Sequence, residues 1–292
     1  MSLYDETLSI LKKFKLQANK ALGQNFLVDI NVVNSIIESA NIDNADLVIE
    51  IGPGLGVLTK RLLEKAYKVI AIELDSNMVN ILKDRFKEEK EEHFTIINND
   101  VLKVDINKLI DEEKKEAWAR NKKINKVKVV ANLPYYISTP IVMKLLESKL
   151  NIESLTIMVQ KEVADRLIAN PGTKYSGSIT YAVNYYSVAE KVLEVGKECF
   201  IPSPKVESEV IKLTIRDKKE VKIDNEEIFF EFIQQVFSQR RKTLANVLVN
   251  FKYVENKEKA QEILNKIGLN DSVRGEAISL EKFAELEKLL EI

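Results

Sequence analysis

Short apolar runs alternate with amphipathic segments from about residue 29 to about residue 160, and this alternation constrains the fold more than any other feature. The runs with strand character are LVIEIG (47–52), KVIAIEL (68–74), FTIINN (94–99), KVKVVA (126–131) and SLTIMVQ (154–160). The segments between them, such as GVLTKRLLEKA and DSNMVNILKDRFKEEKEE, carry apolar residues at helical spacing. Such alternation predicts an α/β protein whose parallel sheet is covered by helices on both faces.

The sequence changes character towards its C-terminal end. Two further strand-like runs, 189–195 and 208–215, have no long helix between them, so part of one sheet edge is expected to be antiparallel. After about residue 217, EEIFFEFIQQVFSQRRKTLANVLVNF, KEKAQEILNKIG and SLEKFAELEKLL all read as helical. We therefore predict a first domain of residues 1–217 and a small all-helical domain of residues 218–292.

Composition excludes several classes of protein. One cysteine, Cys199, excludes an internal disulfide, and one histidine, His93, leaves no plausible zinc cluster. The first residues read as an amphipathic helix without the cleavage site of a signal peptide, and no apolar run approaches membrane-spanning length. The expectation is a cytoplasmic, metal-free protein, with a monomer as the default. A net charge of −1 argues against a coat of positive charge but leaves room for a local basic face.

A glycine-rich loop, Glu50–Gly56 (EIGPGLG), joins the first clear strand to a helix and allows a ligand to approach the backbone. In the dinucleotide fingerprint GxGxxG the third glycine would fall at Val57, so the spacing disfavours a dinucleotide. The next strand ends at Glu73, whose carboxylate can accept hydrogen bonds from both hydroxyls of a ribose. Asp100 follows the third strand and could accept an adenine amino proton, although a solvated strand end explains Asp100 alone equally well. A nucleoside cofactor without a pyrophosphate fits the set, and S-adenosylmethionine is the candidate.

The fourth strand ends in ANLPYYIST, where proline stiffens the backbone and holds the Asn132 carboxamide beyond the strand. An adenine amine is a poor nucleophile, because its lone pair is delocalised into the ring. Hydrogen bonds accepted from its two N–H groups by Asn132 and by a carbonyl near Leu133 or Pro134 would aim that lone pair at a methyl group. Tyr135 would stack on the flipped-out base, whereas Tyr136 is expected in the core.

A second stiff loop, FIPSPKV (200–206), places Phe200 at its entry, where the ring could cover the other face of the base. Taken alone, an FxPxP segment more often has a core phenylalanine beside a stiff connection. Cys199 has no base partner and is expected to be a small buried residue. His93 is expected to be exposed or to cap a helix.

Two charged segments are candidates for contact with nucleic acid. Arg240, Arg241 and Lys242 lie in a predicted helical region whose neighbours face the core, so their charges should point outward beside the catalytic cleft. A solvated helical face is the competing interpretation. The stretch DEEKKEAWARNKKINKVK (111–128) is expected to be a solvated helix and loop, and an RNA-facing role for its lysines, Lys122, Lys123, Lys126 and Lys128, is the minority interpretation.

Taken together, these motifs resemble the ribosomal RNA adenine dimethyltransferases, specifically the type that modifies small-subunit (16S) rRNA. The similar segments are LGQNFLVD (22–29), EIGPGLG, IELD, NDVLK, NLPYYISTP, VQKEVADRL, FIPSPKVES, FSQRRKTLANVL and RGEAISLEKFAEL, which span nearly the whole chain. The resemblance implies a Rossmann-like class I S-adenosylmethionine-dependent methyltransferase domain followed by a helical RNA-binding domain. It also implies dimethylation at N6 of two adjacent adenosines in a 3′-terminal hairpin loop of rRNA, within a pre-ribosomal particle.

The resemblance also implies a set of site residues. Those matching the family's cofactor pocket are Asn25, Leu27, Gly52, Glu73, Asp100 and Asn132. Those matching its target-base site are Asn132, Leu133, Pro134, Tyr135 and Phe200.

Two alternatives stay open at this point. The large-subunit (23S) rRNA methyltransferases that confer macrolide resistance share the glycine loop, an Asn-x-Pro-Tyr motif and FxPxPxV, but Leu133, the FSQRRKT segment and the tail resemble the small-subunit type more. A non-catalytic RNA-binding assembly factor could keep the fold. The presence of Glu73, Asp100 and Asn132 argues against it.

Overall fold

The computed structural model describes residues 2–16, 18–19 and 23–290. Leu22, the first residue of the LGQNFLVD motif, lies outside the described residues. The chain divides into two compact units, which are considered separately. The first comprises Met1–Ala164 and Ala189–Ile215, and the second comprises Asp165–Val188 and Arg216–Ile292.

The first unit is built on a seven-stranded sheet with the order β4-β3-β2-β5-β6-β9-β7. Its strands are β2 (Leu47–Ile51), β3 (Lys68–Glu73), β4 (Phe94–Asn98), β5 (Val127–Asn132), β6 (Ser154–Gln160), β7 (Ser187–Val195) and β9 (Ser208–Ile215). The strands from β4 to β6 pair in parallel, and β9 runs antiparallel to β6. The predicted strands and the antiparallel part of the sheet are confirmed.

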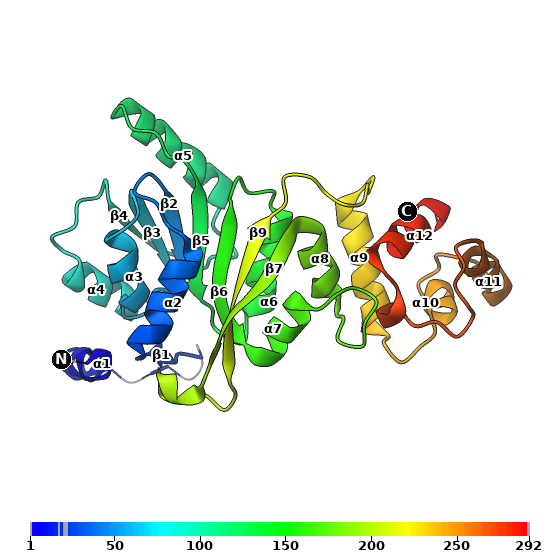
Figure 1. The fold of residues 1–292 in the computed structure, drawn as a ribbon, viewed down its shortest axis with the longest axis horizontal. Coiled ribbons are helices and arrows are strands. Elements are labelled where there is room, and N and C mark those ends of the chain that lie inside the picture. The colour runs from blue at the N-terminus through cyan, green and yellow to red at the C-terminus, as the bar shows by residue number, and fades with distance from the viewer. Residues whose placement is uncertain (1, 17, 20–22, 291–292) are drawn as a thin grey trace. The chain divides into compact units, whose positions relative to one another are not determined.

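The interior strands β2 and β3 are buried along their whole length, and β6 along all but its last residue, because helices cover both faces of the sheet. Right-handed crossovers lead from β2 through α3 (Val57–Leu63) to β3 and from β5 through α6 (Ser138–Glu147) to β6. These crossovers run in opposite directions across the sheet, so α3 and α6 lie on opposite faces. Helix α2 (Ile30–Ala40), which lies in front of the strands in Figure 1, shares a core with α3.

The reversal of direction between β2 and β5 creates a topological switch point. After β2 the chain proceeds to β3 and β4 on one side and then returns to β5 on the other side of β2. In open parallel sheets, ligands bind in the crevice beyond the carboxyl ends of the strands at such a point.

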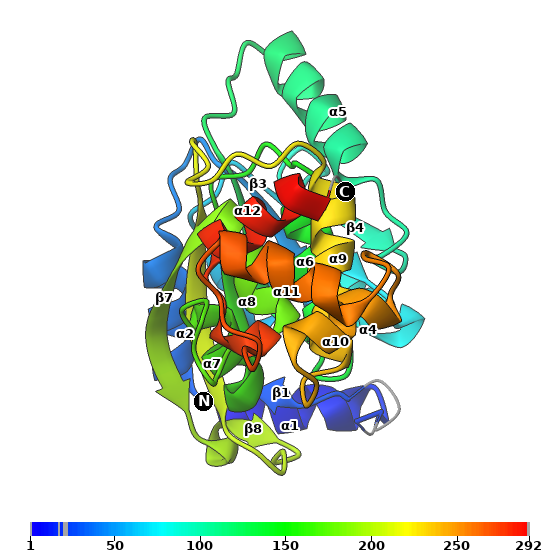
Figure 2. The same ribbon diagram turned by 90° about the vertical axis from the view of Figure 1, so that its right-hand side faces the viewer.

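Helices α1 (Leu3–Lys13), α4 (Ser76–Arg85) and α5 (Ile106–Ala119) complete this unit, with a short antiparallel pair of β1 (Phe26–Leu27) and β8 (Phe200–Ile201). A capping box between Ser2 and Asp5 starts α1, and Arg85 of α4 pairs with Glu6 at 2.5 Å. Helix α5 extends away from the sheet in both views (Figures 1 and 2), which confirms the predicted solvated helix.

The second unit contains the C-terminal half of α7 (Lys161–Ile168), together with α8 (Ser178–Tyr186), α9 (Glu226–Ser238), α10 (Leu244–Asn250), α11 (Lys257–Lys266) and α12 (Leu280–Leu290). This unit resumes at Arg216, close to the predicted boundary after residue 217, but it also includes Asp165–Val188 with α8, which the sequence pattern assigned to the first domain. Its Tyr181 hydroxyl donates to the Ile278 carbonyl at 2.5 Å, and Tyr185 and Tyr186 donate to Glu226 at 3.0 and 2.9 Å. These contacts join residues far apart in the sequence, so local patterns gave no sign of them.

The predicted helix that would run through QRRKT is also interrupted. Helix α9 ends at Ser238 and α10 begins at Leu244, so Arg240, Arg241 and Lys242 lie in the turn between them. None of the helices in the described part of the chain combines the length and apolarity needed to cross a membrane.

Candidate active site

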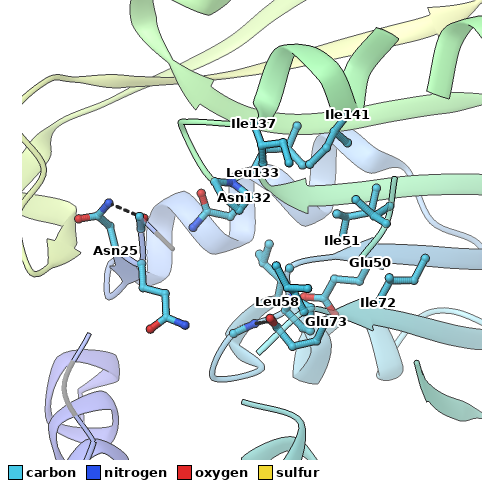
Figure 3. Close-up of a pocket in the computed structure, with 18 of the residues that line it drawn as sticks. Asn25, Glu50, Ile51, Leu58, Ile72, Glu73, Asn132, Leu133, Ile137 and Ile141 are labelled. Atoms are coloured by element: carbon cyan, nitrogen blue, oxygen red, sulfur yellow. Dashed lines mark hydrogen bonds between the residues drawn. The ribbon is translucent and has the colours of Figure 1, made fainter. Parts of the chain in front are cut away.

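A cavity of about 1130 Å³, including space open to solvent, lies at the carboxyl ends of β2, β3, β4 and β5 (Figure 3). Its walls bring together nine of the predicted site residues: Asn25, Leu27, Gly52, Glu73, Asp100, Asn132, Leu133, Pro134 and Tyr135. Phe200 does not line it. The position matches the crevice expected at the switch point.

The glycine loop after β2 needs glycine for two different reasons. Gly52 has a φ of +66°, a left-handed conformation that side chains rarely adopt, and its backbone lies close to Asn132 and Pro134 on the neighbouring strand end. At Gly56, a Cβ atom would lie only 2.6 Å from the Phe86 ring. Gly52 is therefore the glycine that could let a ligand approach the backbone, whereas Gly56 allows α4 to pack against the loop.

Glu73 at the end of β3 is 7% exposed and is held at both oxygens. Its Oε2 accepts from the Gly54 N–H at 3.1 Å, and its Oε1 accepts from the Asp75 N–H at 2.9 Å. Burial raises the pKa of this carboxyl, and the two backbone hydrogen bonds act against that rise. The carboxylate thus braces the glycine loop and keeps a further lone pair on each oxygen for a ligand.

Asp100 and Asn25 are half-buried and both line the cavity. The Asp100 Oδ1 accepts from the Leu102 N–H at 3.0 Å, while Oδ2 has no hydrogen bond from the residues described. The Asn25 amide donates to the Gly23 carbonyl at 3.0 Å (Figure 3). Gln24 next to it donates to Asp75 at 2.8 Å, which fixes this N-terminal segment to the start of α4.

Glu50 also lines the cavity, and the sequence interpretation assigned it no role. It is 1% exposed, and its Oε2 accepts a 2.6 Å hydrogen bond from Thr59. Burial, with a smaller contribution from the negative charge of Glu73, raises the pKa of Glu50 to about 8, although the Thr59 bond acts against it. Its Oε1 is buried with no partner among the described residues. The sequence feature that could have identified Glu50 is a carboxyl group inside an otherwise apolar strand.

Asn132 is the last residue of β5, and its carboxamide points into the cavity (Figure 3). Within the described chain, no hydrogen bond occupies this carboxamide or the Leu133 carbonyl. The Leu133 N–H continues the sheet by donating to the Met158 carbonyl at 3.0 Å, and the Pro134 carbonyl accepts from Ile137 at 3.2 Å. Leu133 therefore offers the freer of the two predicted backbone acceptors.

Comparison with known proteins identifies the family of this chain. The family model for ribosomal RNA adenine dimethylase matches residues 15–291. The chain belongs to this family.

Individual members of the ribosomal RNA adenine dimethylase family and solved structures agree with this result. The ribosomal RNA small subunit methyltransferase A of Oceanobacillus iheyensis is 46% identical over 96% of this chain and 92% of its own length. A dimethyladenosine transferase from Plasmodium falciparum superposes with a TM-score of 0.73 at 26% identity, covering 91% of this chain and 98% of that one. The 23S rRNA methyltransferase ErmE gives a TM-score of 0.65 at 23% identity, covering 92% and 100%, and shows the fold alone.

The two tyrosines that follow the NLP segment of this dimethylase are placed differently from expectation. Tyr135 is half-buried, and its hydroxyl lies 2.5 Å from the Ser208 Oγ. Tyr136 was expected in the core but is 56% exposed and lines the cavity beside Gly23. The expectation for Tyr136 was wrong because the turn after Pro134 directs the second tyrosine outward.

Phe200 is 3% exposed and lies in the core with Leu27, its partner in the β1–β8 pair. The role of Phe200 in a base site stays a prediction, since the ring is covered in this structure. Cys199 is only partly buried, because it lies in the short 3₁₀ helix Lys197–Cys199. His93 is exposed, as predicted, with its ring 3.2 Å from the Tyr67 carbonyl.

The candidate RNA-facing cations fall into two groups. Arg240 is engaged within its own unit, donating to the Ser176 carbonyl at 3.2 Å and to Glu276 at 3.0 Å, whereas Arg241 and Lys242 are exposed. In the first unit, Lys128 is 3% exposed and paired with Asp46, and Lys126 pairs with Glu153. Lys122 and Lys123, which follow α5, are exposed.

Proposed function

We propose that this cavity transfers methyl groups from S-adenosylmethionine to N6 of two adjacent adenosines in the 3′-terminal hairpin loop of small-subunit rRNA. Family membership makes the chain an rRNA adenine dimethyltransferase. The cofactor, the position of the two adenosines and the roles of individual residues are the proposal.

The polar groups around the glycine loop fit a nucleoside cofactor. When bound, S-adenosylmethionine would supply a methyl group on a cationic sulfur. Glu73 would accept from the ribose hydroxyls, and Asp100 would accept from the adenine amine through its Oδ2. Glu73 is already aligned by two backbone donors, so little reorganisation is needed on binding.

The observation that carries the proposal is the pair of acceptors at the end of β5 that receive no hydrogen bond from the described residues. The Asn132 carboxamide oxygen and the Leu133 carbonyl can accept from the two N–H groups of an adenine amine. These bonds would draw the nitrogen lone pair out of conjugation and direct it at the methyl group. The reaction disperses positive charge, so positioning rather than a general base provides much of the acceleration.

The small-subunit substrate is supported by the relatives. The chain is 46% identical to a protein named as a small-subunit methyltransferase and 23% identical to the 23S rRNA methyltransferase ErmE. A purely RNA-binding assembly factor would not need Glu73, Asp100 and Asn132 around one cavity. An rRNA substrate in an assembling particle would place this dimethylase in the cytoplasm.

Two exposed basic segments are available for the RNA backbone. Arg241 and Lys242 lie between α9 and α10 in the second unit, which we propose binds RNA. In the first unit, Lys122 and Lys123 follow Trp118, which is 76% exposed on α5. Cations beside an exposed indole suit a nucleic acid, since they offer phosphate contacts and a stacking surface.

The proposal is tested by incubating the protein and labelled S-adenosylmethionine with purified small subunits that lack the modification, followed by mapping of the modified nucleotides. Naked large-subunit rRNA and the Asn132→Ala variant are the controls. We expect two neighbouring dimethyladenosines in the terminal hairpin and no labelling of the large-subunit RNA. Labelling of the large-subunit RNA alone would assign the chain to the other substrate class.

A further inference from the structure

Ser208 contacts the candidate base site from a distant part of the chain. It is the first residue of β9 and lies opposite Gln160 in the antiparallel pairing with β6. Its side chain is completely buried, and its Oγ lies 2.5 Å from the Tyr135 hydroxyl oxygen. This contact joins the start of β9 to the loop that carries the NLPY residues.

The rest of the Tyr135 residue is held less firmly. Tyr135 lies beyond the end of β5 at Asn132, so no ladder bond restrains it, and among the described residues its carbonyl accepts only a longer bond of 3.3 Å from the Ser138 hydroxyl. A phenol is neutral and able to donate near neutral pH, and burial raises the pKa of the Tyr135 phenol further above that range. The hydroxyl pair is therefore the shorter of the two hydrogen bonds that hold Tyr135, and it restrains the far end of the ring.

We infer that Ser208 is a positioning residue, which holds the Tyr135 ring as one wall of the target-base site. The inference rests on the proposed function, because it assigns the Tyr135 ring to stacking on the flipped adenine. Ser208 touches neither cofactor nor base in this scheme. Its loss should let the ring rotate away from the stacking geometry, so maximal turnover falls while cofactor affinity stays unchanged.

A double-mutant cycle tests this coupling. Ser208→Ala and Tyr135→Phe each remove one side of the hydroxyl pair and keep the aromatic ring. We expect each to lower kcat on small subunits by about tenfold, the effect of roughly one lost buried hydrogen bond. The double variant should be no slower than either single variant, since both changes break the same contact. Cofactor affinity, measured by calorimetry, should match the wild type in all three.

Ser187→Ala is the matched control. Ser187 is also buried in a strand, and its hydroxyl donates to the Val183 carbonyl at 2.9 Å, away from the cavity. A general loss of stability should affect thermal unfolding of both serine variants, but only Ser208→Ala should lower kcat. If Ser208→Ala does not fold, Tyr135→Phe alone still tests the contact, because its ring and the serine both remain.

The outcomes separate this inference from the proposed function. Wild-type turnover in Tyr135→Phe, or single effects that multiply in the double variant, would overturn the positioning role. In that case, methylation of small subunits by the wild type and its loss in Asn132→Ala would leave the proposed function intact. A wild-type protein that methylates no small subunit would overturn both.

Discussion

On the proposed cofactor side of the cavity, formed by β2, β3 and β4, backbone N–H groups of nearby loops hold Glu73 and Asp100, as Gly54 and Asp75 do for Glu73. On the base side, formed by the end of β5, the Asn132 carboxamide has no partner in the described chain, and Tyr135 is restrained by Ser208 from a distant strand. The first side is preorganised locally. On the second side, the acceptors proposed to orient the amine receive no hydrogen bond from the described residues. The Tyr135 ring there is placed by contact with a distant segment.

The largest expected effect is on the rate of methyl transfer, when a residue on the base side of the cavity is replaced. Asn132→Ala should slow methyl transfer by about 100-fold or more, since removal of one precisely placed hydrogen-bonding group at a reacting centre has this magnitude. Binding of the RNA particle should stay close to normal. Asn125→Ala, an exposed residue before the other end of the same strand, is the control and should retain the wild-type rate. Wild-type single-turnover rates in Asn132→Ala would remove the amine-orienting role.

The next effect concerns the cofactor side. Glu73→Ala should weaken binding of S-adenosylmethionine by roughly 1 to 3 kcal/mol, as expected when a charged hydrogen-bond partner is removed. It should also lower the melting temperature without cofactor, because the Gly54 and Asp75 N–H groups lose their acceptor. Calorimetry and thermal unfolding measure the two effects, and unchanged cofactor affinity would exclude Glu73 from the site.

A smaller effect concerns the pH dependence of stability. The folded-state pKa of Glu50 is about 8, above the ordinary value of 4.5, so the folded protein keeps a proton that the unfolded chain releases. The contribution of Glu50 to stability should therefore fall as pH rises from about 4.5 to about 8 and stay level above that. Glu50→Gln should remove this dependence and gain stability relative to wild type between pH 6 and pH 9. Identical urea unfolding curves of the wild type at these two pH values would refute the assignment.

The smallest effect separates binding from chemistry. Replacing Arg241 and Lys242 with alanine should flatten the salt dependence of RNA-particle binding by roughly 0.7 to 0.9 in the log–log slope for each phosphate that is no longer neutralised. Arg240→Ala should mainly reduce stability, because Arg240 is bonded within its unit. If the double variant keeps the wild-type salt dependence, the RNA-binding surface should instead include Lys122 and Lys123.

The same contrast explains what the sequence could predict. The strands, the glycine loop and the carboxylate positions follow from local periodicity and from the rule that parallel strands end at a common edge. The burial of Phe200, the exposure of Tyr136 and the place of α8 in the second unit depend on contacts between distant segments. No role was predicted for Glu50, because the sequence periodicity shows it only as a polar residue within a buried strand.

The most direct test of the two-sided cavity measures single-turnover methyl transfer at increasing S-adenosylmethionine concentration in Glu73→Ala and Asn132→Ala. A defect in cofactor binding is overcome by mass action, whereas a defect in orienting the amine is not. We expect Glu73→Ala to approach the wild-type rate at saturating cofactor and Asn132→Ala to stay at least about 100-fold slower. Full recovery of Asn132→Ala, or no recovery of Glu73→Ala, would contradict this expectation.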